Sequence, residues 1–406
     1  MRLSAEQAPW LQAPHALAVL DALESAGAEG RFVGGCVRNT ILQAPIDDLD
    51  VATPLPPPAV IRALEAAGLR AVPTGVEHGT VTAVCDGRPV EVTTLRRDVE
   101  TDGRRAVVAF TTDWAEDAAR RDFRLNALYA DRQGRVYDPV GGGVDDAGAG
   151  RIVFVGDPET RIREDYLRVL RFFRFRAWYG RGEPDAAALA ACSHLAEGLR
   201  RLSAERVSKE LLKLLGAPDP RLSLGLMAET GVLAHVLPET SSLRRLERLV
   251  KLEAALGRSP DPLLRLAALL PPGSEGAHAV GRRLRLSNPE TARLAAALGG
   301  DDPPLGGDAA SVALYRLGPA AYADQVLLTG AQAGQPAADL QAGLAMAAAW
   351  SRPMFPLRGE DALASGARGP AVGDALRAVE RAWVDGGFRE GRPELLARLE
   401  AQLAGP

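Results

Sequence analysis

The apolar pattern of this chain changes character after Gly141-Gly142-Gly143, and no other feature constrains the fold as strongly. Before these glycines, helix-like and strand-like stretches alternate. After them, long runs rich in Ala, Leu and Arg continue to the last residue, with no convincing strand beyond about Val155. The periodicity predicts helices at residues 16–26 and 57–67 and strands at residues 32–33, 46–52, 81–84 and 90–94. Because strands followed by helices are typical of the α+β class, we predict an α+β fold with one mixed β-sheet first and all-α parts afterwards.

The length of the chain requires more than one hydrophobic core. It has 406 residues, of which 47% are apolar, and single cores stop growing beyond about 250 to 300 residues. Joints rich in Pro and Gly at residues 256–262, 271–276 and 300–307 are candidate boundaries among the helical parts. We predict four parts, at residues 1–150, 151–215, 216–300 and 301–406.

Charge and cysteine content narrow the class of protein. The formal net charge is -4, but residues 151–213 hold 13 Lys and Arg against 9 Asp and Glu, so a local basic surface can still bind phosphates. Cys36, Cys85 and Cys192 lack the spacing of a disulfide scaffold or a zinc site, which favours a reducing compartment. No apolar run is long enough to span a membrane, and the first residues lack the apolar core of a signal peptide. We expect a cytoplasmic protein without a membrane partner. The sequence contains no coiled-coil heptads and does not indicate an oligomeric state.

Two aspartates in a strand-like segment are the first candidates for chemistry. Asp48 and Asp50 are two residues apart, so a strand places both carboxylates on one face, about 7 Å apart. Carboxylate oxygens are the ligands that Mg²⁺ prefers, and two ions can share such a pair while keeping positions open for phosphates. Glu91, between Val90 and Val92, adds a third carboxylate if its strand is a neighbour. Solvated turn and surface positions are the alternative interpretation of these acids.

A glycine turn precedes these aspartates. Gly34 and Gly35 follow a short apolar strand and lead into a helix that carries Arg38 within its first turn. The backbone amides and positive end of such a helix can hold a phosphate, to which Arg38 adds a cation. Taken alone, the pattern is more typical of an ordinary tight turn, because Gly-Gly turns are widespread.

Four segments, taken together, resemble a known family. They read GGCVRN, DLDVAT, RRDFRLNALY and REDYLRVLRFFRF, in an order and at a spacing similar to those of the bacterial class II CCA-adding and poly(A) polymerase family. The resemblance covers roughly residues 15–215. It implies a polymerase-beta-like nucleotidyltransferase head at 1–150, a helical neck that reads the base at 151–215, a body at 216–300 and a tail that binds tRNA at 301–406.

The resemblance also implies roles for individual residues. Asp48 and Asp50 would hold the catalytic metals, with Glu91 beside them, and Gly34, Gly35 and Arg38 would hold the triphosphate. The ribose- and phosphate-contacting set would be Arg120, Arg121, Asp122 and Asn126. Asn39 departs from the family, in which Asp is common, and keeps an acceptor while losing the charge.

The last segment predicts how a base is chosen. On a helix, Asp165 and Arg168 are three residues apart and share a face that Arg171 continues. Cytosine and adenine each present an amino donor beside a ring acceptor, so Asp165 can accept from the amino group while Arg168 donates to the ring. Guanine and uracil present the opposite order, and each mismatched buried group costs about 1 to 3 kcal/mol. An ordinary helical salt bridge between the two residues is the alternative.

These observations predict an enzyme that adds C, C and A to the 3′ end of tRNA without a template. The substrates would be CTP and ATP, the cofactor Mg²⁺, the product pyrophosphate and the partner tRNA. A poly(A) polymerase, an enzyme adding only A or only CC, and a non-catalytic RNA-binding module are the alternatives. The segment TGVEHGTV at residues 74–81 is more similar to the CCA-adding branch than to the poly(A) polymerases. The polar stretch 97–119 resembles the mobile loop with which CCA-adding enzymes change from adding C to adding A. The alternative interpretation of this stretch is a plain surface loop with one strand. Residues 203–210 resemble a motif that braces the base-reading helix.

Overall fold

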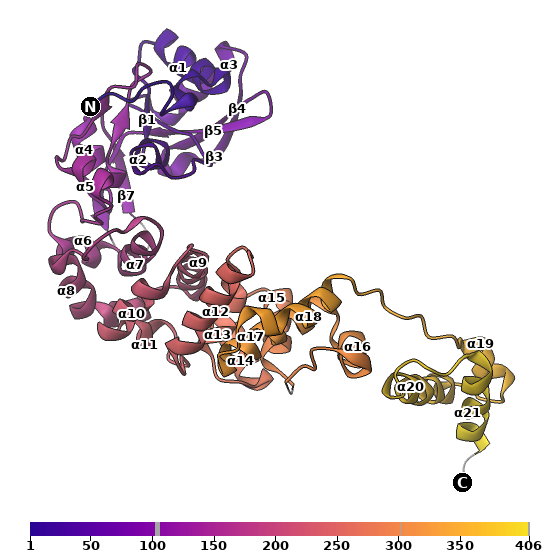
Figure 1. The fold of residues 1–406 in the computed structure, drawn as a ribbon. Coiled ribbons are helices and arrows are strands. Elements are labelled where there is room, and N and C mark those ends of the chain that lie inside the picture. Colours follow the sequence, from indigo (N-terminus) through magenta and orange to yellow (C-terminus); the bar gives the residue numbers. More distant parts are fainter. Residues whose placement is uncertain (102–105, 301, 405–406) are drawn as a thin grey trace. The chain divides into compact units, whose positions relative to one another are not determined.

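The computed structural model describes residues 1–101, 106–300 and 302–404. The chain forms two compact units, Met1–Pro238 and Glu239–Pro406, each with its own core. Figure 1 shows the strands confined to the indigo and magenta part of the first unit. The boundary between the two units falls inside the predicted part at residues 216–300, and the four predicted parts stay predictions.

A mixed sheet organises the first part of the first unit. Its seven strands lie in the order β3-β4-β5-β2-β1-β8-β9, and only β2 and β5 pair in parallel. The strands are β1 (Arg31–Val33), β2 (Asp50–Thr53), β3 (Arg70–Gly75), β4 (Thr80–Cys85), β5 (Arg88–Thr94), β8 (Tyr129–Ala130) and β9 (Val136–Tyr137). A separate antiparallel hairpin consists of β6 (Arg96–Thr101) and β7 (Ala106–Phe110). The predicted mixed sheet is therefore confirmed.

Helices cover this sheet, and one of them begins and ends as the sequence predicts. The helices are α1 (Pro14–Ser25), α2 (Gly35–Leu42), α3 (Pro57–Ala66), α4 (Trp114–Ala119) and α5 (Gly143–Ala149), with 3₁₀ turns η1 (Pro9–Gln12), η2 (Val76–His78) and η3 (Arg124–Asn126). Proline opens α3, and Gly68, with a φ of +74°, follows its end. Val90 and Val92 of β5 are fully buried, and Glu91 between them is exposed, which is the period of two expected of a strand with one covered face.

The predicted strand at residues 46–52 is wrong at its start. Strand β2 begins at Asp50, and residues 46–49 have no regular structure. Asp50 pairs with Glu91 in the parallel register, so a longer ladder would place Asp48 opposite Pro89. Proline has no N–H to donate, and the ladder cannot extend to Asp48.

The rest of the first unit is helical. Its helices are α6 (Pro158–Glu164), α7 (Leu167–Tyr179), α8 (Ala186–His194), α9 (Ala204–Leu215), α10 (Arg221–Glu229) and α11 (Val232–Val236), with the 3₁₀ turn η4 (Ala196–Arg201). Helix α7 packs against α9 and α10, and its Phe172 and Phe173 are fully buried. In the part of the chain that is described, the last strand ends at Tyr137, which confirms the predicted change to helices.

The second unit is entirely helical in its described residues. Its helices are α12 (Leu243–Ala255), α13 (Pro262–Leu269), α14 (Ser274–Arg283), α15 (Asn288–Leu298), α16 (Gly307–Leu317), α17 (Pro319–Ala333), α18 (Ala337–Ala348), α19 (Gly359–Ala364), α20 (Pro370–Asp385) and α21 (Arg392–Ala404). Trp383 and Tyr315 lie in a core shared by the last helices and α16. None of the helices in the described ranges is long and apolar enough to cross a membrane.

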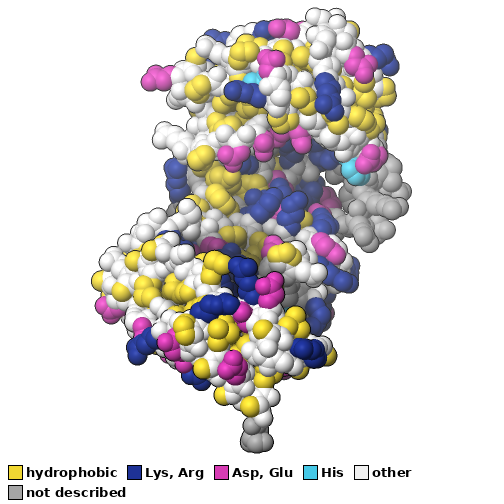
Figure 2. All heavy atoms as spheres, turned by 90° about the vertical axis from the view of Figure 1, so that its right-hand side faces the viewer, with side chains coloured by type: hydrophobic (Ala, Val, Ile, Leu, Met, Phe, Trp, Pro, Cys, Tyr) yellow, Lys and Arg dark blue, Asp and Glu magenta, His cyan; other side chains and the backbone are white. Residues whose placement is uncertain are grey.

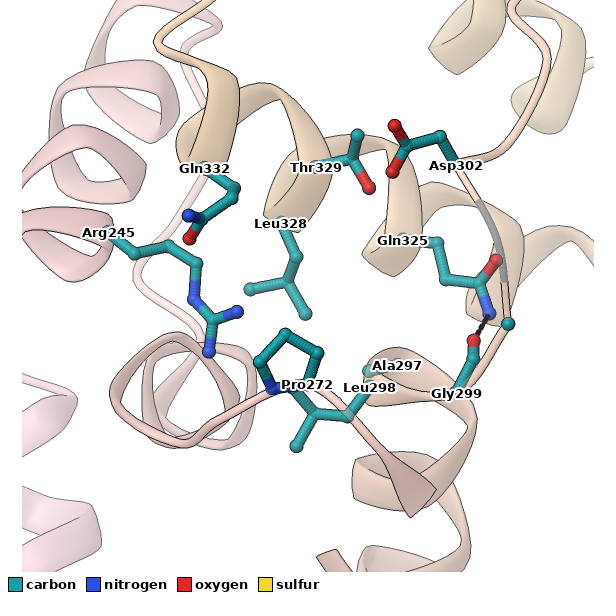
Figure 3. A pocket seen from close by; sticks show the side chains of 11 residues that line it. Arg245, Pro272, Ala297, Leu298, Gly299, Asp302, Gln325, Leu328, Thr329 and Gln332 are labelled. Atoms are coloured by element: carbon teal, nitrogen blue, oxygen red, sulfur yellow. Dashed lines mark hydrogen bonds between the residues drawn. The ribbon is translucent and has the colours of Figure 1, made fainter. Parts of the chain in front are cut away.

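A small cavity of about 110 Å³ lies among α12, α15 and α17 of this unit, and Figure 3 shows the guanidinium of Arg245 at its edge. This buried cation donates to the carbonyls of Ala267, Ala268 and Leu270. The carbonyls at a helix end carry partial negative charge, so Arg245 caps the end of α13. We assign this cavity a structural role.

Candidate functional site

A cavity of about 330 Å³ in the first unit brings most of the predicted site together. Figure 2 shows dark blue Lys and Arg side chains gathered in a recess at mid-height of the view. The cavity is lined by all ten predicted nucleotide-binding residues, with Asp50 and Phe175 in addition: Gly34, Gly35, Arg38, Arg120, Arg121, Asp122, Asn126, Asp165, Arg168 and Arg171. Predicted phosphate-binding and base-reading residues, far apart in the sequence, thus face one space.

The glycine turn forms one wall because of its backbone. Gly34 has φ 67° and ψ -111°, a conformation that side chains with a Cβ strongly disfavour, and it precedes the first residue of α2. A Cβ built on Gly35 would meet no atom within 4 Å, so its backbone borders open space. The first amides of α2 are therefore accessible to an anion in the cavity.

Arg38 is held in place without an acid. Its guanidinium donates to Asn39 Oδ1 at 2.9 Å, to Asn126 Oδ1 at 2.5 Å and to the Tyr179 hydroxyl at 3.2 Å. Burial lowers the pKa of Arg38, while Tyr179 and Asp122 raise it. Among the described residues, Arg38 forms no ion pair, so its charge is left for a ligand phosphate.

The departure at Asn39 has a local explanation. The side-chain amide of Asn39 donates to the carbonyl of Pro45 at 2.5 Å, while its oxygen accepts from Arg38. An aspartate would keep the second hydrogen bond and lose the first, because a carboxylate has no proton to donate. The amide thus ties the end of α2 to the loop that leads to β2.

Asp117, which the sequence did not single out, positions the arginine pair. Its two oxygens accept from Arg120 at 2.7 and 2.9 Å, from Arg121 at 2.9 and 3.2 Å, from the Tyr129 hydroxyl at 2.7 Å and from the amide of Arg96 at 3.2 Å. Burial works to raise the pKa of Asp117, but Arg121 and Arg120 outweigh it and hold the pKa at about 2. A single buried carboxylate therefore orients two cations of the cavity.

Asp122 links the strand region to α7. Its Oδ2 accepts from two nitrogens of Arg171, at 2.7 and 2.5 Å, and its Oδ1 accepts from Asn126 Nδ2 at 2.9 Å. Burial opposes ionisation, yet Arg171 and Asn126 lower the pKa of Asp122 to about 2. Because Asn126 also holds Arg38, the two predicted segments form one connected network.

The prediction that Asp165 lies on a helix is wrong. Helix α6 ends at Glu164, and Asp165 has an extended backbone, with φ -153° and ψ 105°, before α7 begins at Leu167. Its Oδ1 accepts from the amide of Leu167 at 3.1 Å, and its Oδ2 accepts from Arg206 of α9 at 2.7 Å. Asp residues commonly satisfy free amides at helix starts, and here this hydrogen bond competes with continuation of the helix.

The alternative of a salt bridge between Asp165 and Arg168 is also wrong. Arg168 pairs instead with Glu164 at 2.6 Å and donates to the carbonyls of Arg161 and Arg120. Asp165 is held by Arg206, which lies in the motif predicted to brace this region. Both side chains nevertheless line the cavity, so an acceptor and a donor face the same space.

The three candidate metal-binding carboxylates are neighbours but do not all line the cavity. Asp50 lines it, Glu91 is the register partner of Asp50 in β5, and the exposed Asp48 lines an adjacent cavity with Asp47. Burial, Glu91 and Asp48 raise the pKa of Asp50 to about 6, against the opposing charges of Arg121 and Arg38. Such mutual repulsion is what a cation would relieve.

Within the described ranges, no group of three His, Cys, Asp or Glu side chains is arranged as a complete metal site. Asp50 lines the cavity, and Glu91 and Asp48 lie near it, so carboxylate oxygens of the kind that a hard cation binds face or border this space. Mg²⁺ binds in this way, using one or two carboxylates together with substrate phosphates.

Some residues of the site were missed although the sequence carried a signal for them. Asp117 lies three and four residues before Arg120 and Arg121, a helical spacing hidden in a stretch predicted to be a loop. Phe175 lies four residues after Arg171 and continues the same face of α7. Tyr179 has the same spacing, four residues after Phe175 in α7, but its hydrogen bond to Arg38 depends on the tertiary fold.

Comparisons with known proteins agree with this architecture. Residues 30–153 match the family described as Poly A polymerase head domain, and residues 183–243 match the family described as Probable RNA and SrmB-binding site of polymerase A. The mitochondrial CCA tRNA nucleotidyltransferase 1 of Mus musculus is 39% identical over 248 residues, which are 59% of this chain and 56% of the mouse protein. The match thus spans little more than half the length of that relative.

A second relative matches over nearly its whole length. The CCA-adding enzyme of Limosilactobacillus fermentum is 33% identical over 376 residues, 91% of this chain and 92% of that protein. The structure of the Bacillus stearothermophilus CCA-adding enzyme in complex with CTP superposes with a TM-score of 0.74 at 29% identity, covering 96% of this chain and 97% of the other. The Thermotoga maritima CCA-adding enzyme complexed with tRNA shares the fold, with a TM-score of 0.66 at 19% identity over 98% of each chain.

Proposed function

The chain belongs to the family of CCA-adding enzymes, and we propose that it adds C, C and A in turn to the 3′ end of tRNA, using CTP and ATP and releasing pyrophosphate. The observation that carries this proposal is the shared cavity. Asp50 and Arg38 face the same space as Asp165 and Arg168, so one nucleotide can reach both groups with its phosphates and its base.

The triphosphate would be bound by cations and amides of the head. Arg38, Arg120 and Arg121 are oriented by buried partners, and the amides at the start of α2 border the same cavity. Because these groups are already held in place, they would neutralise the charge that develops on the phosphates with little reorganisation. Asp122 and Asn126 would contact the ribose side of the nucleotide, and Arg171 would continue the base-reading face.

The base would be selected by Asp165 and Arg168. A carboxylate has about four acceptor sites, and only two are used by Leu167 and Arg206, so Asp165 can still accept from an amino group. Arg168 would donate to the ring acceptor next to it. Cytosine and adenine satisfy both groups, whereas uracil and guanine leave them mismatched.

The acids beside the cavity would hold the divalent metal, for which we propose Mg²⁺ bound by Asp48 and Asp50, with Glu91 as a third catalytic carboxylate. When bound, Mg²⁺ would lower the pKa of the attacking hydroxyl and stabilise the leaving oxygens. In the reaction, the 3′-hydroxyl gives up its proton to water, its oxygen bonds to the α-phosphorus, the bond between the α-phosphorus and the bridging oxygen to the β-phosphate breaks, and pyrophosphate leaves.

The relatives support tRNA as the partner. One of the solved neighbours is described as a complex with tRNA, and the family matched by residues 183–243 is described as an RNA-binding site. We propose that residues 1–150 act as the head, 151–215 as the neck, 216–300 as the body and 301–406 as the tail that contacts tRNA.

The test is incubation with a tRNA transcript that ends at its discriminator base. We expect two added residues with CTP alone and three with CTP and ATP together, in the presence of Mg²⁺. Long tails from ATP alone would identify a poly(A) polymerase, and a product that stops after CC, or a requirement for a tRNA already ending in CC, would identify a partial enzyme. Absence of any product with all nucleotides would contradict the proposal.

A further inference from the structure

An exposed tryptophan stands at the end of the helix that lines the nucleotide cavity. Trp178 is 42% exposed and is one of few large apolar side chains at the described surface. Its indole nitrogen donates to the carbonyl of Lys213 at 2.7 Å, so the ring is fixed against α9. An indole held in this way leaves part of its ring available to a ligand.

Cations gather beside this ring. Helices α7 and α9 pack against each other, and Figure 1 shows them as neighbours. Arg174 of α7 and the exposed Lys209 and Lys213 of α9 lie around a single buried acid, Glu210, which pairs with Arg174 at 2.5 Å. Arg174, Trp178, Lys209 and Lys213 are called the α7–α9 face below.

The charges of this face are not balanced within the protein. Neither Lys209 nor Lys213 forms an ion pair with any described residue. Burial lowers the pKa of Lys213, and the neighbouring Arg174 and Lys209 lower it further, against the attraction of Glu210. Like charges held together in this way are stabilised by a bound polyanion.

The face continues from the cavity along α7. Arg171 and Phe175 line the cavity, and Arg174 and Trp178 follow on the next turns of the same helix. Trp178 lies seven positions after Arg171, a rise of about 10 Å along the helix. Stacked nucleotides repeat at about 3.4 Å along one strand, so this length corresponds to about three of them.

We propose that the α7–α9 face binds the single-stranded 3′ end of the RNA, with one base stacked on Trp178 and the adjoining phosphates bound by the exposed Lys209 and Lys213. Aromatic rings stack on any base, and basic side chains follow the backbone, which suits a strand whose terminal residue changes at each addition. This inference rests on the proposed function, and it assigns the single-stranded 3′ end of the tRNA to the α7–α9 face of the first unit.

The test compares variants of the full chain for RNA binding and for addition. We expect Trp178→Ala to raise the Kd for a short single-stranded RNA, and the KM for tRNA lacking CCA, by about tenfold, while kcat and the KM for CTP stay unchanged. Trp178→Phe keeps a ring and should recover most of the affinity. Unchanged Kd and KM in Trp178→Ala would overturn the inference, as would a blunt RNA duplex competing better than the single strand.

The lysines offer a matched control, because the chain has only three and the third, Lys251, is exposed on α12. Lys213→Ala leaves the carbonyl that holds Trp178. The double variant of Lys209 and Lys213 to Ala should reduce the slope of log Kd against log salt by about 1.4, since each contact to a single strand contributes about 0.7. An equal effect of Lys251→Ala would overturn the inference. Wild-type protein that binds the single strand but adds no nucleotide would instead contradict the proposed function.

Discussion

At the residue scale, Asp50 is distinguished from the other acids by its place between cations and like charges. It lies in the cavity with Arg38 and Arg121 on one side and beside Glu91 and Asp48 on the other. We expect Asp50→Ala to lower the rate of CTP addition by at least about a thousandfold, because loss of the metal removes several kcal/mol of transition-state stabilisation. Single-turnover assays with labelled CTP measure this.

The melting temperature of Asp50→Ala should not fall, since the substitution removes a carboxylate that its acidic neighbours repel. The exposed Asp47 gives the control, and Asp47→Ala should retain activity. Persistent addition by purified Asp50→Ala would contradict the role of this residue.

Asp165 is the residue on which nucleotide choice depends. We expect Asp165→Ala to shift the ratio of UTP to CTP incorporation towards UTP by about 10- to 100-fold, because one mismatched group costs about 1 to 3 kcal/mol. Competition between the two nucleotides in one reaction measures this ratio.

Arg206→Ala is a second variant that tests whether the position of the Asp165 carboxylate affects nucleotide choice. It leaves the carboxylate in place and removes the guanidinium that holds it at 2.7 Å, so a smaller shift is expected. A variant of Asp165 that discriminates as well as the wild type would show that the base is read elsewhere.

Asp117 makes stability depend on pH in a defined window. Its pKa in the fold, about 2, is below the ordinary value of 3.8, so the ionised form stabilises the fold above pH 4 to 5, and this contribution is lost as the pH falls towards 2. The shift corresponds to about 2 kcal/mol. In Asp117→Asn, Arg120 and Arg121 lose their acid, and we expect the free energy of unfolding at neutral pH to fall by about 3 kcal/mol.

Urea unfolding between pH 7 and pH 2 measures this difference, which should shrink on acidification. Asp145→Asn removes an exposed carboxylate of the same unit and should leave the neutral-pH stability unchanged. A constant difference between wild type and Asp117→Asn at all pH values would contradict the assignment.

At the scale of elements, the sequence predicts helices and strands that follow from apolar periodicity. It does not predict the starts and breaks that are decided by contacts with other segments. The alternation of buried and exposed residues around Glu91 predicts β5. The proline at the start of α3 and the glycine after its end predict the limits of that helix. The break at Asp165 is not visible in the periodicity, because a side-chain hydrogen bond to Leu167 and an ion pair from α9 decide it. The start of β2 is set by Pro89 of a strand about forty residues away.

In the candidate site, too, residues in local motifs were predicted, whereas contacts between distant segments were not. Motif spacing predicted the residues that line the cavity, since each motif is local. The side chains that orient them come from other segments, and a spacing pattern does not contain those contacts. Asp117 is the intermediate case, because its helical spacing to Arg120 was present in a stretch rich in loop-forming residues.

The hairpin of β6 and β7 occupies part of the stretch predicted to be mobile, and residues 102–105, between the two strands in the sequence, lie outside the described residues. Two strands are present where the plain-loop interpretation had one. The hairpin is connected to the cavity at its base, where the amide of Arg96 donates to Asp117. Movement of the hairpin would therefore be transmitted to the arginine pair.

Replacing residues 98–108 by a short Gly-Ser link should separate the two additions. All twelve described residues that line the cavity remain in this variant, so binding and addition of C should persist, whereas the addition of A should be lost because the hairpin would no longer reposition Arg120 and Arg121. Product length on a tRNA transcript measures the outcome. Full CCA addition by this variant would show that the hairpin has no part in the change from C to A.

At the scale of the whole molecule, the nucleotide cavity and the stability of the second unit should be separable. The cavity lies wholly within Met1–Pro238, whereas Glu239–Pro406 has its own cores. Glu253 and Arg265 form an ion pair at 2.8 Å inside the second unit, with side chains only 4% and 2% exposed. Burial raises the pKa of Glu253, and Arg265 opposes this shift.

Arg265→Ala leaves that carboxylate buried without its main cation, which costs about 3 to 5 kcal/mol. We expect calorimetry to show two transitions, of which only the one belonging to the second unit moves to lower temperature, while the Kd for CTP is unchanged. Arg244→Ala removes an exposed cation from α12, the helix that carries Glu253, and should shift neither transition. If Arg265→Ala weakened CTP binding in proportion to its loss of stability, the two units would have to fold as one, and the independence of the cavity would be disproved.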